Sequence, residues 1–509
     1  MKLRLALRVL LVLALALTWG GASRAQLGGD LRALSDAITE IDLERAARLA
    51  RSSDETPAFL FERARLLVYL GDCVGASTLL SNPAITEARE GAQLAEIARG
   101  CARATAAGLV VEDKERGIWL RLQDDADRVF APFVFRVAAQ ARDRIGAELG
   151  VDLPRPLRID LVRDLFSLAA VTGLPLEAAE TTGTLAVARF GRIIMLSPRA
   201  TRSGFHWEDT LAHELTHLLV TRATRDRAPL WLQEGVAKRE ENRWREERPF
   251  DAKDWAEETA VRALRRGRQI GIDKLGPSIA MLPTPEAAST AYAEVQSFVS
   301  YFVREQGDAA LRLLFADLKG LGADDPSSAL RSVSGYDLAQ WNRRWQKSLL
   351  DSPFGQVVTA PTHGQVLDAR DLARRARLGD LLIDGGHGAE AALVLAPGSA
   401  GGSPGYRARV AKAELARRDP AQAAARLGVE TEIDGLYGPW FGLRGRLFES
   451  SDRLAANRAF ELGLASDPLA EEVACEGRFT VGSEPDDPKL PASPDWKALC
   501  ESSRALPRD

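Results

Sequence analysis

Apolar side chains recur at intervals of three and four residues over most of this chain, which is the spacing of helices. The blocks that show this spacing are 27–108, 118–150 and 208–350. Between them, residues 157–162 alternate apolar and polar and predict a half-buried strand. Residues 184–190 and 193–196 predict two more strands, joined as a hairpin at Gly191-Arg192. The pattern therefore predicts an α+β fold, with a small sheet inside a mostly helical chain.

The pattern changes beyond residue 350. Residues 351–364 hold two Pro and two Gly and predict a linker. Ala-rich helical stretches follow at 366–396, 406–427 and 436–470. The last stretch has the spacing of a tetratricopeptide repeat, in which a small residue on one helix lets the antiparallel helix approach. The residues at that spacing are Trp440, Leu443, Leu447, Ala456, Phe460 and Pro468.

Small and apolar residues at 64–76 follow a similar spacing. We therefore predict a tetratricopeptide-like helical domain over residues 26–115 and a second one over 365–509. The second ends in an extended tail, because residues 482–494 are rich in Pro and Asp. Such repeats either bind a protein partner in a concave groove or serve only as packing modules.

Composition narrows the class of protein. The 509 residues are 46% hydrophobic and 27% charged, which is ordinary globular usage. A net charge of −4 gives no reason to expect nucleic-acid binding. Residues 1–25 have a basic start, the apolar run Val9–Trp19 and small residues before Gln26, which predicts a cleaved signal peptide. We expect an exported protein, periplasmic or secreted, that contacts a membrane only if this segment stays uncleaved.

The four Cys residues fit an oxidising compartment. Cys73 and Cys101 lie in one helical block, and Cys475 and Cys500 lie near the end of the sequence. Of three possible pairings, we predict the two local bridges Cys73–Cys101 and Cys475–Cys500. The alternative is that the thiols are buried and reduced.

The candidate chemistry lies in the motif His213-Glu214-Leu-Thr-His217. Two His residues four apart project from one side of a helix, and this separation suits two imidazole nitrogens on one tetrahedral Zn²⁺. Glu214 lies beside them, where it can reach a water on the metal rather than the metal itself. The motif therefore predicts one Zn²⁺ per chain.

A catalytic zinc site needs a third protein ligand. Pro229 and the apolar run after it predict a second helix, from which Glu234 projects seventeen residues after His217. His206, which lies upstream in a predicted loop, is the alternative. We favour Glu234.

The run from the HELTHLLV helix to APLWLQEGVA resembles the peptidase MA-like gluzincins, the thermolysin-related zinc peptidases. The resemblance covers about residues 116–350 and implies a small N-terminal sheet and a helical C-terminal lobe. It implies that His213, His217 and Glu234 are the zinc ligands and that Glu214 is the general base. It also suggests an oxyanion donor, for which Tyr292 is our candidate and Tyr301 the rival.

The chain departs from this family at one position. Lys238 stands where members usually place an acid that orients a ligand His. Glu240, Glu241 or a backbone carbonyl would have to replace it.

We expect a zinc endopeptidase acting on peptides or proteins, and the edge strand at 185–190 is a candidate site for an extended substrate. Two alternatives remain. One is a non-enzymatic envelope adaptor with a vestigial zinc site, and the other is a zinc amidase acting on a non-peptide substrate.

Overall fold

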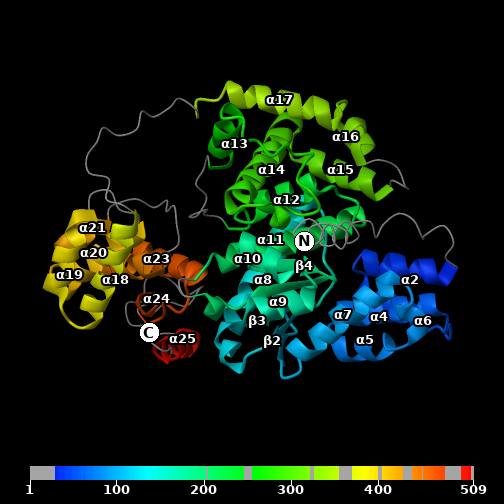
Figure 1. Cartoon of the computed structure of the whole chain (residues 1–509), viewed down its shortest axis with the longest axis horizontal. Coiled ribbons are helices and arrows are strands. Elements are labelled where there is room, and N and C mark those ends of the chain that lie inside the picture. The colour runs from blue at the N-terminus through cyan, green and yellow to red at the C-terminus, as the bar shows by residue number, and fades with distance from the viewer. Residues whose placement is uncertain are drawn as a thin grey trace, which may run out of the picture.

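The structure is a computed structural model. It describes residues 29–201, 204–245, 255–320, 326–354, 369–398, 404–427, 438–449, 451–475 and 494–505. The predicted signal peptide, most of the predicted linker and nearly all of the predicted tail lie outside these ranges. Among the described residues, helices surround one small sheet, as the α+β prediction requires (Figure 1).

The sheet has five strands in the order β1-β2-β3-β5-β4. β2, β3 and β5 run parallel, and β1 and β4 are antiparallel edge strands. The bounds are β1 (Leu109–Asp113), β2 (Ile118–Leu122), β3 (Leu157–Val162), β4 (Ala186–Arg189) and β5 (Arg192–Leu196). The predicted hairpin is confirmed as β4–β5, and β4 is an edge strand as expected.

Two predictions about strands were wrong. Residues 118–122 form β2 and not a helix, because Ile118, Leu120 and Leu122 alternate at the strand period and are buried. β3 is almost fully buried rather than half-buried, because it has a parallel neighbour on each side. β1 pairs with β2 although it lies before residue 116, where we expect the peptidase domain to begin.

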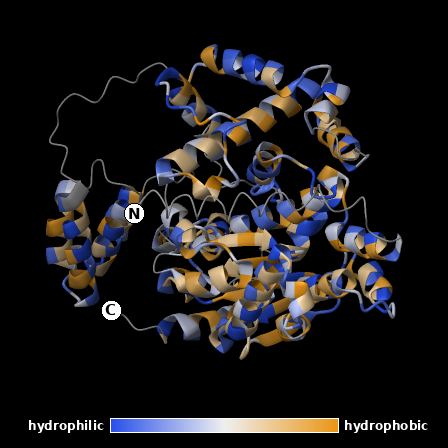
Figure 2. Cartoon of the chain, turned by 45° about the vertical axis from the view of Figure 1, so that its right-hand side comes forward, coloured by the Kyte–Doolittle hydropathy of each residue, from blue (hydrophilic) through white to orange (hydrophobic). Residues whose placement is uncertain are grey.

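A buried ion-pair network holds the three central strands together. Asp160 of β3 is 1% exposed, and its two carboxylate oxygens each lie 2.6 Å from a guanidinium nitrogen, one from Arg121 of β2 and one from Arg192 of β5. Burial lowers the pKa of Arg192 to about 10, although Asp160 opposes this shift. The strands are otherwise strongly apolar and lie at the centre of the molecule (Figure 2).

Helices cover the sheet and form a lobe beyond it. α8 packs against the HExxH helix α11, and α11 packs in turn against α12. The helices beside the sheet are η2 (Asp125–Phe130), α8 (Ala131–Leu149), α9 (Leu165–Thr172), α10 (Leu176–Thr182) and α11 (Trp207–Thr224). The helical lobe comprises α12 (Leu230–Glu240), α13 (Trp255–Arg265), α14 (Pro285–Gln306), α15 (Ala309–Gly320), α16 (Pro326–Ser334) and α17 (Leu338–Leu350).

The helices before the sheet form what we call the N-terminal module, residues 29–104. It lies to one side of the sheet in Figure 1. Its helices are α2 (Gly29–Thr39), α3 (Leu43–Leu49), α4 (Pro57–Leu70), α5 (Cys73–Leu79), α6 (Pro83–Thr86) and α7 (Arg89–Ala104). The predicted Cys73–Cys101 bridge is present and joins α5 to α7.

The described helices beyond residue 368 form consecutive pairs. They are α18 (Ala369–Asp384), α19 (Gly388–Leu395), α20 (Pro404–Ala416), α21 (Pro420–Leu427), α22 (Gly438–Phe448), α23 (Arg453–Ser466), α24 (Glu471–Ala474) and α25 (Pro494–Arg504). α22 and α23 approach closely, because a Cβ on Gly445 would lie 2.7 Å from the Phe460 ring. The predicted Cys475–Cys500 bridge is present and joins the end of α24 to α25.

The last helices dock onto the sheet side of the molecule. The Trp496 ring of α25 meets the Phe133 ring of α8 edge-on, with 6.0 Å between centroids. Trp207, at the start of α11, donates its indole N–H to the Leu464 carbonyl of α23 over 2.7 Å. None of the described helices combines the length and the apolar character that a membrane crossing requires.

Candidate metal centre

The HExxH residues lie on α11, a helix surrounded by protein on most of its faces. Leu211, Leu215 and Leu219 are fully buried and fix the rotation of the helix. That rotation turns His213 and His217, both partly exposed, toward α12. The helix ends at Thr224, and Arg225 after it adopts a left-handed conformation with φ 55°.

Three side chains converge between α11 and α12. The Nε2 atoms of His213 and His217 lie 3.1 Å apart, and Glu234 Oε2 lies 3.6 and 3.5 Å from them. Three ligands on a tetrahedral zinc with bonds of about 2.0–2.1 Å are about 3.3 Å apart. Glu234 Oε2 is also buried and accepts no well-aligned hydrogen bond, so it lacks a partner that an ion would supply. The three residues therefore fit a zinc ion.

Both imidazoles have a polar partner behind the group, one on α12 and one directly after its end. His213 Nδ1 lies 3.1 Å from Glu241 Oε2, and His217 Nδ1 lies 3.3 Å from Gln233 Oε1. An acceptor at Nδ1 holds the proton there and leaves the Nε2 lone pair for a metal. Glu241 therefore occupies the role for which the sequence offered Glu240, Glu241 or a carbonyl, and Lys238 forms an ion pair with it.

The charges of this group are strongly coupled. Burial alone would lower the pKa of His213, but the Glu234 and Glu241 carboxylates raise it to about 10. Burial would raise the pKa of Glu234, but His217 and His213 hold it well below its usual range. A metal ion that binds here must therefore compete with the proton on His213.

Glu214 faces a different element from the three converging residues. Its Oε2 accepts a hydrogen bond of 2.5 Å from the Ala188 N–H of strand β4. Burial raises the pKa of Glu214, and the nearby His217 and His213 partly oppose the shift. A carboxylate with a raised pKa beside a metal group has the proton affinity that a general base requires.

The two candidate Tyr residues lie at different places on α14. The Tyr292 ring lies edge-on to the His213 ring, with 6.4 Å between centroids. Tyr301 lies further along the helix and packs against Trp341, with 6.0 Å between ring centroids. His206, the alternative third ligand, precedes α11 and is not one of the three converging residues.

Sequence reasoning did not identify Gln233 or the Ala188 N–H. Gln233 directly precedes the third candidate ligand, so its position next to Glu234 was the available signal. The Ala188 contact is made by a backbone group and comes from tertiary packing of β4 on α11, so no residue type marks it.

Comparison with known proteins identifies one domain. Residues 137–351 match the family model described as the Peptidase MA superfamily. The match includes every residue of the converging group. No curated protein and no solved structure matches the chain. The match supports a peptidase MA-like domain over these residues, and the His-His-Glu group agrees with the metal dependence typical of that superfamily.

Proposed function

We propose that this protein is an exported, zinc-dependent metallopeptidase of the gluzincin type and acts as an endopeptidase. The observation that carries the proposal is the convergence of His213, His217 and Glu234 beside Glu214. These three residues would hold one zinc ion. The two disulfides support export to an oxidising compartment.

When bound in such a site, zinc polarises the scissile carbonyl and makes a water molecule more acidic. Glu214 accepts the proton of the attacking water and passes it to the leaving amine. Tyr292 lies next to His213, so its hydroxyl is our candidate donor to the developing oxyanion. Glu241 and Gln233 keep the two imidazoles oriented during this sequence.

The edge strand β4 is the proposed binding site for an extended substrate. Leu196 donates its N–H to the Leu185 carbonyl, so the strand alternation directs the N–H groups of residues 186 and 188 away from β5. A peptide added at this edge would pair with the N–H and carbonyl of residue 186 and with the carbonyl of Ala188, because the Ala188 N–H already donates to Glu214. Such pairing continues on both sides of the scissile bond, and the sequence has no Gly-x-Met-Glu-Asn element for gripping a free N-terminus. Both points favour an endopeptidase.

The helices that flank the peptidase MA-like domain are proposed to be tetratricopeptide-like repeats. The burial of Trp440, Ala456 and Phe460 between α22 and α23 supports this for one pair. A protein partner on these helices remains part of the proposal.

The test compares the chain from residue 26 onward with its Glu214→Gln form on a complex peptide library, read by mass spectrometry. Both proteins are loaded with zinc, and their zinc content is measured. We expect internal cleavages by the first protein only, with equal zinc in both. Equal peptide profiles at full zinc occupancy would reject the peptidase and favour the adaptor or the amidase.

A further inference from the structure

The turn between β4 and β5 has an unusual central residue. Phe190 and Gly191 adopt φ values of 55° and 64°, so both central positions are left-handed, as in a type I′ turn. Asn and Gly favour these positions, whereas a bulky side chain there is strained. A residue held in such a conformation requires support from its surroundings.

The N-terminal module supplies that support. Phe190 is 8% exposed and joins an apolar cluster whose other members all come from α4 to α7 and the residue after α5. The Tyr69 ring meets the Phe190 ring edge-on, with 6.0 Å between the ring centroids. The Arg189 guanidinium lies over the Phe190 ring, 4.8 Å from its centroid. Gly191 allows this fit, because a Cβ there would lie 2.8 Å from Tyr69. The tip of the hairpin is therefore inserted in the core of the module.

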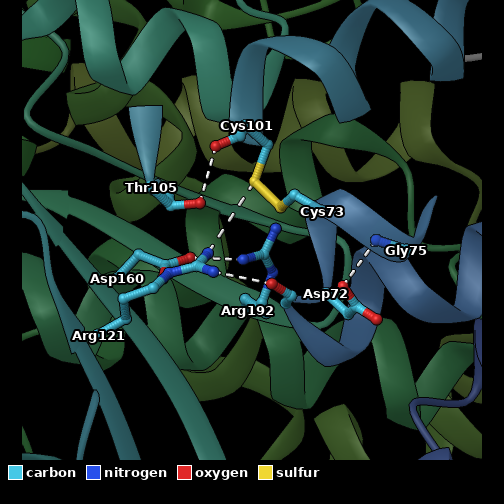
Figure 3. Close-up of a disulfide and its surroundings, with 9 residues drawn as sticks. Asp72, Cys73, Gly75, Cys101, Thr105, Arg121, Asp160 and Arg192 are labelled. Atoms are coloured by element: carbon cyan, nitrogen blue, oxygen red, sulfur yellow. Dashed lines mark hydrogen bonds and ion pairs between the residues drawn. A yellow bond between two sulfur atoms is a disulfide. The ribbon is translucent and has the colours of Figure 1, made fainter. Parts of the chain in front are cut away.

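A second connection reaches the other end of the turn. Arg192, the first residue of β5, binds Asp160, and Asp160 binds Arg121. Figure 3 shows Arg121, Asp160 and Arg192 together beside the disulfide. Arg121 in turn donates to the Gly71 carbonyl over 2.8 Å. Gly71 ends α4 and is followed closely by Cys73, whose disulfide to Cys101 fixes α5 on α7. The module thus holds the hairpin through Phe190 in its turn and through Arg192 directly after the turn.

The held segment includes the strand that touches the candidate general base. Ala188 lies two residues before Phe190, and its N–H donates to Glu214. The metal group, in contrast, is formed by α11 and α12, neither of which contributes to the apolar cluster around Phe190.

We propose that the N-terminal module is a positioning device for the active-site edge strand, and that Phe190 is the positioning residue through which it acts. The catalytic part of this inference rests on the proposed function. The structural part, that anchoring of Phe190 orders β4, does not depend on it. Loss of the anchor therefore changes strand order and substrate turnover while zinc binding stays intact.

The decisive variant is Phe190→Asn in the full chain. Asn favours the left-handed turn conformation, so this change removes the anchoring ring without adding turn strain. Phe190→Leu is the conservative variant, because it keeps an apolar side chain in the cluster. Ile85→Ala is the matched control, since Ile85 is a buried member of the same cluster on α6, which packs on α4 and α7.

Hydrogen exchange over residues 184–196 gives a readout that does not require activity. We expect exchange at the Ala188 amide to be at least about tenfold faster in Phe190→Asn than in the unmodified chain. We expect Phe190→Leu to restore most of the protection and Ile85→Ala to leave it unchanged. Equal exchange in Phe190→Asn and Ile85→Ala would overturn the proposal.

Kinetics and zinc titration test the catalytic part. We expect kcat/KM to fall by about 100-fold in Phe190→Asn, because a misplaced strand misaligns substrate and base. Zinc affinity should stay within about twofold, because the ligands sit on other elements. Faster exchange with unchanged kcat/KM would reject the positioning role. If the unmodified chain cleaves nothing, the proposed function fails, whereas the exchange comparison still decides whether the module orders β4.

Discussion

Glu241 Oε2 lies 3.1 Å from His213 Nδ1, where an acid can orient the imidazole. Glu241 follows Glu234 by seven residues on the same helical segment, and positions four and seven residues along a helix share one face. Glu241 therefore lies on the side of the helical segment that faces the metal group. Lys238 binds the same carboxylate and holds it in place.

Removing this acid is expected to weaken metal binding. We expect Glu241→Ala to lower zinc affinity by about 10–100-fold, because His213 loses the partner that fixes its tautomer. A competition titration with a chelator measures the change. Glu258→Ala is the control, since Glu258 forms only a half-exposed pair with Arg262 on α13 and should leave zinc affinity unchanged. Equal affinities in the two variants would contradict the role of Glu241.

Substitutions of the two Tyr residues on α14 are expected to have different effects on kcat. We expect Tyr292→Phe to lower kcat by about 10²–10³-fold with little change in KM, which is the typical loss of one oxyanion donor. Tyr301→Phe should leave kcat unchanged, because Tyr301 packs against Trp341 away from the metal group. Steady-state kinetics on one cleaved peptide compares them. A larger loss in Tyr301→Phe would assign the donor to that residue instead.

Zinc affinity is expected to rise with pH. The Glu234 and Glu241 carboxylates raise the pKa of His213 to about 10, so the metal-free protein holds a proton on this imidazole at neutral pH that zinc must displace. Release of one proton per ion gives about a tenfold gain in affinity per pH unit. Titrations at pH 6, 7 and 8 measure the slope. A flat profile would show that the imidazoles are already neutral before zinc binds.

The buried carboxylate in the sheet is expected to be essential for stability. Asp160→Asn leaves Arg121 and Arg192 buried without a counter-charge, and we expect a loss of about 3–5 kcal/mol in the free energy of unfolding. Urea denaturation measures it. Asp125→Asn breaks an exposed pair with Arg128 and should show no measurable change. Similar stability of both variants would mean that the network is hydrated.

Asp467, which follows α23, predicts a dependence of stability on pH. Burial raises its pKa to about 6, above its ordinary value of 3.8, although the backbone N–H groups of Leu469 and Ala470 oppose the shift. Between pH 4 and 6 the folded state therefore binds more protons than the unfolded state. The free energy of unfolding falls as pH rises through that window. We compare the free energy of unfolding of Asp467→Asn with that of the unmodified chain at pH 4 and at pH 7. From pH 4 to pH 7, this difference is expected to shift in favour of the variant by on the order of 2–3 kcal/mol. An equal difference in urea stability at both pH values would reject this.

Local patterns were enough to predict the parts of the site that lie on single helices. His213 and His217 face one side because of the helical period, and Glu234 follows from the next apolar helix. The choice between Glu240 and Glu241 depended on how α12 is rotated against α11. Glu240 is instead fully buried and forms an ion pair with Arg239. No residue type in the sequence marks how α12 is rotated.

Long-range contacts explain most of what the sequence did not reveal. β2 spans five residues shortly before a helical block, and this length is too short for its alternation to stand out. The polar residue in β3 suggested an exposed face, but Asp160 is buried because its partners come from two other strands. The insertion of Phe190 into the N-terminal module likewise joins segments more than 90 residues apart in the chain.

The docking of α25 onto the sheet side has a consequence for the order in which the protein folds. Trp496 and Leu499 belong to the same apolar core as Phe133 and the central strands. A chain that is synthesised from its N-terminus lacks the cover that α25 gives Phe133 until these late residues arrive. The peptidase MA-like domain therefore cannot complete its core while the chain is still emerging, and final closure of the core is an event that follows delivery of the whole chain.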